Sequence, residues 1–414
     1  MNRKNDKQLV VGLDVGTSKV VAIVGEYGAE AGAETVEVVG VGSHVSRGLK
    51  RGVVVDIEAT VNSIQRAVEE AELMAGCDIR SVYASISGSH LETRNSQGTA
   101  AIRDREVTQG DLAQVLDAAR AVAIPADRQL LYVEAQEYRI DGQEGIRRPV
   151  GMSGVRLEAG VHLVTGAASA AQNLSKCIQR CGLTVDELVP SALASAKAVL
   201  TEDERELGVC LVDIGAGTTD VSIFAQGAIR HTRALPYGGD QVTSDIANFA
   251  HTPTADAEEL KVKYACALGQ LAHSEETIQV PSVGDRPPRR WARQQLAQVV
   301  QARYEEIFEQ VQRELHRSGY ESLVAAGIVL TGGAARMEGA LELAEEIFHK
   351  MVRIGTPLRV EGLADVVCDP IHSTGVGLLL HGVRMGGMRH APGPMAGSMG
   401  AWVGRARGWL KRNF

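Results

Sequence analysis

The same apolar pattern occurs twice along the chain. Residues 9–14 are mostly apolar and end in an aspartate, residues 16–19 form a glycine turn, and residues 20–24 are apolar again. Residues 209–224 repeat this order of strand, turn and strand. Short apolar runs around glycine turns predict buried strands, and a repeated unit predicts two related halves that face one another.

A different pattern separates the two repeats. Thr108 and Asp111 have the spacing of a helix capping box, an apolar stripe follows them, and the helix should end before Pro125. Extended runs lie between residues 130 and 140, ahead of an Asp-Gly turn. We therefore expect residues 85–161 to form a small α/β subdomain inserted in the first half.

The second half contains one long amphipathic helix, which should end at Gly319. Its apolar positions recur at helical spacing: Leu296, Val299, Val300, Tyr304, Ile307, Phe308, Val311 and Leu315. Residues 386–400 are rich in Gly, Met, Pro, Ala and Ser and show no periodicity, which predicts a flexible linker.

These patterns predict an α/β protein of several domains. The chain has 414 residues, 44% of them apolar, and its 45 glycines favour many tight turns. The predicted division is residues 1–84 and 162–195 for the first half, 85–161 for the insert, 196–385 for the second half with a smaller subdomain at about 235–320, 386–400 for the linker and 401–414 for a terminal helix.

Charge is distributed unevenly along the chain. The formal net charge is −8, yet after Asp369 the chain carries basic side chains and no acidic one. An acidic body argues against nucleic-acid binding, and a basic terminus indicates an anionic surface as a partner.

Targeting signals and cysteine spacing suggest a cellular compartment. The cysteines form no CxxC pair, the N-terminus lacks the apolar stretch of a signal peptide, and no apolar run is long enough to span a membrane. We therefore expect free thiols in a cytoplasmic protein that does not cross a membrane.

Candidate chemistry lies in the turns of the two repeats. A single Asp-x-Gly turn, as in residues 14–17, is more typical of a structural hairpin than of a ligand site, but two copies favour a shared phosphate site. The two aspartates at the strand ends, Asp14 and Asp213, would then meet across a cleft. Their carboxylates suit a hydrated Mg²⁺ that bridges the phosphates of a nucleotide.

The second turn carries further phosphate-binding features. Gly215 and Gly217 allow backbone N–H groups to approach phosphate oxygens, and Thr218 and Thr219 add hydroxyl donors. A third glycine turn, at residues 332–333 after an apolar strand, could lie flat against a nucleoside. The chain has no GxxxxGK[ST], and the second turn lacks the third glycine of GxGxxG, which disfavours P-loop and Rossmann sites.

The three turns, in this order and at this spacing, resemble the superfamily of actin, sugar kinases and heat-shock chaperone ATPases. Over essentially the whole chain the resemblance sharpens to the FtsA family of bacterial cell-division proteins. Matching segments include GLDVGTSK at residues 12–19, GMSGVR at 151–156, TEDERELG at 201–208 and LTGGA at 330–334. The resemblance implies a duplicated actin-like ATPase fold that lacks actin's usual second subdomain and carries the insert at a different place.

The resemblance also implies ATP and Mg²⁺ as cofactors and completes the predicted site. Glu258 and Lys261 match the adenosine-contacting Glu and Lys of the superfamily, although an exposed charge pair on a helix explains either residue alone. The predicted ATP-binding residues are Asp14, Gly16, Thr17, Ser18, Lys19, Asp213, Gly215, Gly217, Thr218, Thr219, Gly239, Glu258, Lys261, Gly332, Gly333 and Arg336. Asp14 and Asp213 would hold the Mg²⁺ through water.

One segment departs from active ATPases. Residues 190–195, PSALAS, offer no Gln or Glu where actin-like proteins position the attacking water. Because orienting that water is a large part of phosphoryl transfer, we expect weak or regulatory hydrolysis at most, and we assign no catalytic residue.

The C-terminal segment AWVGRARGWLKRNF predicts a membrane-targeting helix, since its apolar residues cover one arc of a helical projection and its cations the rest. The predicted membrane-binding residues are Trp402, Val403, Arg405, Arg407, Trp409, Leu410, Lys411, Arg412 and Phe414. Docking of this helix on the protein's own body is the alternative. FtsA-like proteins end in such a helix, which implies a peripheral protein on anionic lipids of the cytoplasmic face of the inner membrane at midcell.

The resemblance also supplies partners. Proteins of the family self-associate into filaments, recruit later division proteins and bind the acidic and hydrophobic C-terminal tail of the tubulin-like protein FtsZ. A local basic cluster lies in the second half, although a solvated loop is its default interpretation. The predicted FtsZ contacts are Arg286, Arg289, Arg303 and Tyr304.

The function expected from the sequence is that of an ATP-binding cell-division protein that polymerises and tethers the FtsZ ring to the membrane. A small-molecule kinase of the sugar-kinase type is the alternative, because it shares the phosphate hairpins. It leaves the basic terminal helix unexplained and requires a substrate base that the sequence does not identify. A chaperone ATPase would need a peptide-binding β domain after the nucleotide fold, and the sequence shows none.

Overall fold

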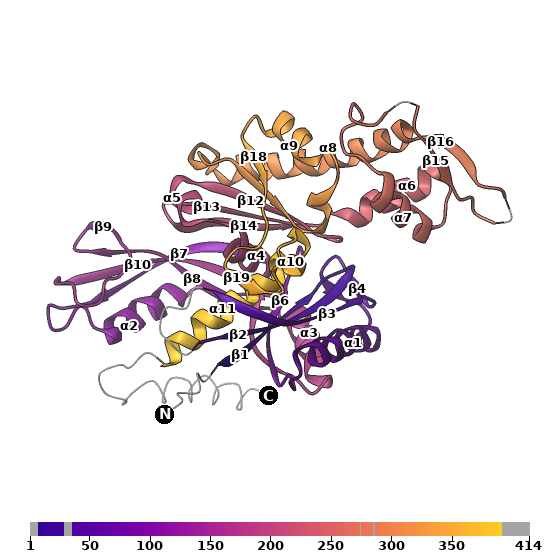
Figure 1. Cartoon of the computed structure of the whole chain (residues 1–414). Coiled ribbons are helices and arrows are strands. Elements are labelled where there is room, and N and C mark those ends of the chain that lie inside the picture. The colour runs from indigo at the N-terminus through magenta and orange to yellow at the C-terminus, as the bar shows by residue number, and fades with distance from the viewer. Residues whose placement is uncertain (1–6, 29–34, 274, 285, 391–414) are drawn as a thin grey trace.

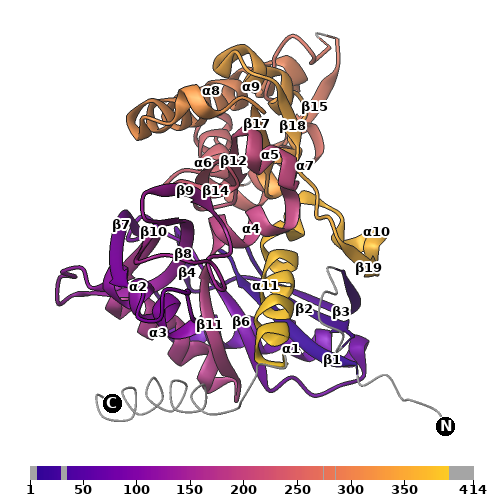
Figure 2. The same ribbon diagram turned by 90° about the vertical axis from the view of Figure 1, so that its left-hand side faces the viewer.

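The computed structural model describes residues 7–28, 35–273, 275–284 and 286–390. Two large sheets of related topology form the two halves, and a third sheet projects from the side of the first half (Figures 1 and 2). The expected duplication in an α/β fold is confirmed.

The first half is built on a six-stranded sheet of order β11-β6-β1-β2-β3-β19. Its strands are β1 (Gln8–Val15), β2 (Lys19–Tyr27), β3 (Val36–Val45), β6 (Ser81–Ile86), β11 (Thr184–Pro190) and β19 (Val360–Gly362), and a short hairpin of β4 (Leu49–Lys50) and β5 (Val53–Val54) lies beside it. Val11 and Leu13 pack towards α1 (Ile57–Ala75) and α3 (Ala168–Arg180), whereas Val10 belongs to the core on the other face. β1 is buried on both faces, which explains its continuous apolar sequence.

The second half repeats this arrangement in a five-stranded sheet of order β14-β13-β12-β17-β18. The strands are β12 (Val209–Ile214), β13 (Thr219–Ala225), β14 (Ala228–Leu235), β17 (Ile328–Thr331) and β18 (Val352–Ile354). In each half an antiparallel hairpin, β1–β2 or β12–β13, pairs in parallel with one further strand, β6 or β17. Helices α5 (Glu202–Leu207), α9 (Ala340–Phe348) and α10 (Ala364–Val367) complete the connections.

Two helices lie between the large sheets. Residues of α4 (Ser191–Val199) and α11 (Ser373–His390) share one core with Ile23 of the first sheet and Leu211 of the second. The helices approach closely because Gly377 faces the backbone of Ala194, where a side chain would collide with the carbonyl. This pair therefore joins the two halves.

The insert is a four-stranded antiparallel sheet of order β7-β10-β8-β9, with α2 (Gln109–Arg120) packed on it. The strands are β7 (Glu92–Ala101), β8 (Arg128–Ile140), β9 (Gln143–Ile146) and β10 (Arg156–Ala167). Thr108 caps α2 through the predicted capping box. The predicted boundary at residue 161 falls inside β10, because Leu163 and Val164 remain buried and keep the strand in the sheet.

A smaller subdomain extends from the second half (Figure 1). It contains α6 (Gly239–Ala250), α7 (Thr254–Tyr264), the hairpin β15 (Thr277–Val280) and β16 (Arg289–Ala292), and α8 (Arg293–Ser318). The predicted long helix is α8, and it ends at Gly319, whose φ of 75° is the left-handed conformation of a helix C-cap.

The predicted linker begins too early. Residues 386–390 continue α11, which packs on β1 and β2, and Gly386 lies against the ring of Tyr27. Packing on the sheet thus stabilises a glycine-rich helix end that local propensity disfavours. The rest of the predicted linker and the terminal helix, residues 391–414, lie outside the described residues.

Candidate nucleotide site

A cleft of about 510 Å³ lies between the two halves, where the turns of the repeated hairpins meet. All predicted nucleotide residues except Thr219 line this cleft. Segments far apart in the sequence, around residues 14–19, 213–218, 258–261 and 332–336, therefore face one space.

The two predicted metal-site carboxylates, the partly buried Asp14 and the buried Asp213, are held by hydroxyl groups. Ser85 donates to Asp14 at 2.7 Å, and Ser195 and Thr374 both donate to the same oxygen of Asp213, Thr374 at 3.3 Å. Burial raises the pKa of Asp14, and burial together with the charge of Asp14 raises the pKa of Asp213 to about 6. The fold thus holds two carboxylates in a position that favours a cation between or beside them.

A third carboxylate, which the sequence interpretation missed, belongs to this cluster. Asp220 pairs directly with Asp213 across β12 and β13, and Ser87 donates to its two oxygens at 2.9 and 2.8 Å. Burial, with the charge of Asp213 as the next cause, raises the pKa of Asp220 to about 8. The signal was present in the sequence, because Asp220 follows the second glycine turn and a tight hairpin brings it opposite Asp213.

The glycine turns bring backbone close to the carboxylates. Gly332 has a φ of 86°, and a Cβ at this position would collide with the carboxylate of Asp213. A Cβ on Gly217 would approach the hydroxyl of Thr17 and the backbone of Arg51. A larger residue at either position would therefore collide with the residues that line the cleft.

Thr219 does not face the cleft. It is fully buried on β13, and its hydroxyl donates to the carbonyl of Tyr237 at 2.8 Å. The prediction that Thr219 contacts the nucleotide is therefore wrong. Adjacent residues of a strand point to opposite faces, and on β13 the neighbour of Thr219, Asp220, is the residue that lines the cleft.

Basic side chains lie in the same cleft. Burial lowers the pKa of Lys19 to about 8 despite the nearby charge of Asp14. Arg336 pairs with Asp369 at 3.4 Å. Lys261 donates to Glu258 at 2.7 Å and to Thr243 at 2.8 Å, so the predicted charge pair is part of the cleft wall, with Lys261 largely buried and the side chain of Glu258 46% exposed.

In the described part of the chain, no group of three His, Cys, Asp or Glu residues has the geometry to hold a metal ion by itself. The acidic cluster instead offers buried carboxylates that are already fixed by hydroxyl donors. This donor set fits a hydrated Mg²⁺, which keeps several waters and takes its remaining ligands from phosphates.

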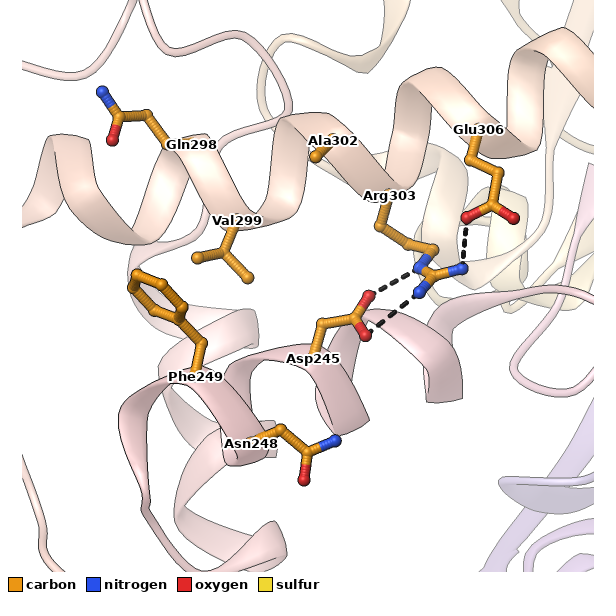
Figure 3. A pocket seen from close by; sticks show the side chains of 8 residues that line it. All are labelled: Asp245, Asn248, Phe249, Gln298, Val299, Ala302, Arg303 and Glu306. Carbon is orange, nitrogen blue, oxygen red and sulfur yellow. Dashed lines mark hydrogen bonds and ion pairs between the residues drawn. The ribbon is translucent and has the colours of Figure 1, made fainter.

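A second hollow lies on the smaller subdomain, between α6 and α8 (Figure 3). Arg303 lies at one end, where it donates to both oxygens of Asp245 and pairs with Glu306, while Phe249 and Val299 line the other end. We refer to this hollow as the α6–α8 groove. It combines an apolar end with a charged end.

Three of the four residues predicted to contact FtsZ are accessible, and the fourth, Tyr304, is buried. Arg286 and Arg289 are exposed near the β15–β16 hairpin, and Arg303 lines the α6–α8 groove. Tyr304 is 1% exposed, and its hydroxyl donates to the carbonyl of Ala334 beside the nucleotide cleft. The prediction of Tyr304 as a surface contact is wrong, because it belongs to the apolar stripe by which α8 packs on its core.

The predicted membrane-binding residues lie outside the described residues. Within the described part of the chain, no helix combines the length and apolar character needed to span a bilayer.

Family models match two regions of the chain. The model described as "Cell division protein FtsA" matches residues 210–377, and the model described as "SHS2 domain inserted in FTSA" matches residues 88–165. The second match coincides closely with the insert sheet, which runs from Glu92 to Ala167.

The curated relatives of the chain carry the same description. "Cell division protein FtsA" of Pseudomonas aeruginosa is 63% identical over 377 residues, which cover 91% of this chain and 90% of the relative. "Cell division protein FtsA" of Escherichia coli strain K12 is 47% identical over 423 residues and covers both chains completely.

Solved structures with low sequence identity share the fold. The chain in the PilM-PilN type IV pilus biogenesis complex matches with a TM-score of 0.65 at 16% identity, over 90% of this chain and 98% of that one. MreB5 of Spiroplasma citri bound to ADP matches with a TM-score of 0.57 at 14% identity, over 93% and 99%. The fold, the inserted subdomain and the full-length relatives agree, and the chain belongs to the FtsA family of cell-division proteins.

Proposed function

We propose that the chain binds ATP with Mg²⁺ in the cleft between its halves and tethers the FtsZ ring to the cytoplasmic face of the membrane. It would do so as a self-associating protein that recruits later division proteins. The observation that carries the nucleotide proposal is the convergence of Asp14, Asp213 and Asp220 with glycine turns and basic side chains in one cleft. Family membership over the whole chain favours this role over the kinase alternative.

The chemistry of the cleft walls fits the parts of Mg-ATP. Glycine turns present backbone N–H groups to phosphate oxygens, and Lys19 lies beside Asp14 to balance phosphate charge. Asp14 and Asp213 would hold the hydrated Mg²⁺, which supplies charge neutralisation of the phosphates when bound. Gly239, Glu258 and Lys261 would contact the nucleoside from the second half, with Gly332, Gly333 and Arg336 on the adjoining wall.

Binding with slow hydrolysis is the activity that these residues support. Ser191 and Ser195 of α4 occupy the connecting segment, and Ser195 is already engaged with Asp213. A serine hydroxyl is a weak group for orienting an attacking water. Asp220 faces the same cleft, but Ser87 donates to both of its oxygens.

Asp213→Ala tests the nucleotide proposal. We expect the affinity for a fluorescent ATP analogue in the presence of Mg²⁺ to fall at least tenfold, since the change removes a carboxylate of the proposed magnesium site. Asp365→Ala, at an exposed position of α10, is the matched control and should bind like the parent. Equal affinities of the two variants in equilibrium titration would contradict the site assignment.

We propose that the C-terminal tail of FtsZ binds the α6–α8 groove and the adjacent hairpin. An acidic and hydrophobic peptide would place apolar side chains against Phe249 and Val299, and its carboxylates near Arg303, Arg286 and Arg289. Phe249 is 60% exposed although its ring meets Trp291 edge to face at 5.5 Å, so a partner could bury it. Arg303 would leave the carboxylate of Asp245 and pair with a carboxylate of the peptide instead.

Fluorescence anisotropy with a labelled FtsZ C-terminal peptide tests this docking. Phe249→Ala should weaken binding by removing the apolar contact, and Arg286→Glu with Arg289→Glu should weaken it by charge repulsion, each about tenfold. Arg313→Glu, exposed elsewhere on α8, controls for a general change of charge. A loss in the arginine pair alone would place the peptide on the hairpin, and unchanged binding in both variants would exclude this face.

A further inference from the structure

The insert subdomain belongs to the first half by chain connectivity, yet it also contacts the second half. Strands β7, β8 and β10 of the insert lie against β14, the edge strand of the second sheet (Figures 1 and 2). An edge strand presents backbone groups that have no partner strand. The backbone carbonyls on the free edge of β14 are therefore available to accept hydrogen bonds from side chains of the insert.

Three polar side chains of the insert donate to three carbonyls of β14, those of Ile229, Arg230 and Thr232. Thr93 donates to the carbonyl of Thr232 at 2.9 Å, Asn95 donates to that of Arg230 at 3.0 Å, and Gln136 donates to that of Ile229. Pairing between β13 and β14 shifts register at Arg230, so this residue has no partner on β13. Asn95 satisfies a carbonyl that the irregular strand exposes.

A buried histidine completes this contact. His162 is 1% exposed, its Nδ1 lies 2.7 Å from Oδ1 of Asn95, and its Nε2 lies 2.9 Å from the hydroxyl of Thr232. Because the amide nitrogen of Asn95 donates to a carbonyl, its oxygen accepts from Nδ1–H, and Nε2 accepts from the threonine hydroxyl. Burial lowers the pKa of His162 to about 4, so the ring is neutral and each polar atom has a matched partner.

This interface lies next to the part of the nucleotide cleft that contains Asp220. Ser87, which precedes the insert, donates to Asp220 inside the cleft, and Thr93 bonds to β14 a few residues later along the chain. A small cavity lined by Asp220, Thr93 and Thr232 separates the two contacts. The segment from Ser87 to Thr93, which leads into the insert, thus contacts the second half both in the cleft and at β14.

The insert and the subdomain of α6 and α7 lie on opposite sides of the helices that join the halves (Figure 1). Rotation of the second half about α4 and α11, which would widen the cleft, must therefore displace β14 relative to the insert. Hydrogen bonds to backbone carbonyls depend on direction and distance, so such a displacement breaks them.

We infer that Thr93, Asn95, Gln136 and His162 form a brace that fixes the angle between the two halves and so slows release of nucleotide from the cleft. The four side chains are positioning residues, because they act on the cleft through the placement of β14. The nucleotide part of this inference rests on the proposed function. The mechanical part, a fixed angle between the halves, does not.

The test is the triple variant Thr93→Val, Asn95→Leu and Gln136→Leu in the full chain. Stopped-flow measurement with a fluorescent ATP analogue should show roughly tenfold faster dissociation, since three hydrogen bonds between the halves are lost. Thr99→Val, exposed on the same strand, is the control and should leave the rate unchanged. A second triple variant, with Thr93→Ser in place of Thr93→Val, keeps the hydroxyl at this position. Its nucleotide should dissociate more slowly than that of the first triple variant.

Hydrogen exchange in the nucleotide-free proteins tests the brace independently. In the triple variant the amides of β14 and also those of the cleft turns, residues 15–19 and 214–218, should exchange several-fold faster than in the Thr99→Val control. Faster exchange confined to β14 would show that the contact is merely local and would overturn the brace. Dissociation and exchange rates equal to those of the control would overturn it as well. If the parent bound no nucleotide at all, the proposed function would fail, and exchange in the cleft turns would still decide the brace.

Discussion

At the scale of single residues, the cleft concentrates negative charge that the folded protein can hold only at a cost. Asp213 and Asp220 are buried, Asp14 is partly buried, and each has a raised pKa because desolvation disfavours its charged form. Hydroxyl donors on Ser85, Ser87, Ser195 and Thr374 reduce this cost without removing it. The folded protein therefore tolerates these three carboxylates without a cation, and a bound cation would stabilise their charged forms.

Asp220→Asn should stabilise the protein free of metal and nucleotide. The pKa of Asp220 is raised from 3.8 to about 8, so ionisation destabilises the folded state progressively as the pH rises through this interval. Asparagine keeps the shape and an acceptor for Ser87 but carries no charge. We expect the Tm measured in EDTA to rise by roughly 5 °C at pH 8 and by less at pH 5.

Asp365→Asn, at an exposed site, controls for the general loss of a charge and should leave the Tm nearly unchanged at both pH values. A gain for Asp220→Asn that is equal at pH 5 and pH 8 would show that the carboxylate of Asp220 does not titrate in this range.

At the scale of elements, the α4–α11 pair decides how the halves are joined. Both helices are rich in small residues, and Gly377 lies directly against the backbone of Ala194. Ser195 in the middle of α4 and Thr374 in the first turn of α11 both donate to Asp213. The packing of two helices thus sets the position of a carboxylate in the cleft.

Gly377→Ala should destabilise the protein even though alanine favours helices. The added Cβ would collide with the carbonyl of Ala194, and overpacking of this kind costs about 1–3 kcal/mol, more than the gain in helix propensity of about 1 kcal/mol. Gly110→Ala in α2, where the Cβ meets only the side chain of Thr108, should be neutral or stabilising. Denaturant unfolding that ranks the two variants in the opposite order would contradict this account of the α4–α11 contact.

At the scale of the whole molecule, the expected anchor lies beyond the body that the structure describes. Removal of residues 402–414 should release the protein from anionic vesicles and leave ATP binding intact, because the predicted anchor follows the end of α11 and no described cleft residue belongs to it. Trp409→Glu should release the protein nearly as well, since a charge on the apolar arc opposes insertion. Binding of the intact protein should weaken as salt screens the cations.

Co-sedimentation with vesicles at several salt concentrations measures this binding, with Trp409→Phe as the control that keeps an aromatic ring. A truncated protein that still pellets with vesicles like the parent would show that the anchor lies elsewhere. A single tail should bind weakly, and an assembly of several bodies should bind more tightly through effective concentration.

The sequence alone determined the features that depend on local physics. The two hairpins, the capping box of α2, the end of α8 at Gly319 and the glycine turns of the cleft all follow from periodicity, hydrogen-bond needs at helix ends and the conformational freedom of glycine. Even the cleft could be anticipated, because a duplicated strand–turn–strand unit must place its two turns in related positions.

Tertiary structure decided the features that depend on which distant residues meet. Asp220 joins the acidic cluster through its register with Asp213, whereas the burial of Tyr304 already followed from its place on the apolar stripe of α8. α11 continues to His390 because a sheet supports it. The brace joins Asn95 and His162 of the insert to β14, and no local pattern distinguishes these side chains from ordinary polar positions on a strand. Their partners on β14, the carbonyl of Arg230 and the hydroxyl of Thr232, come into reach only through the fold.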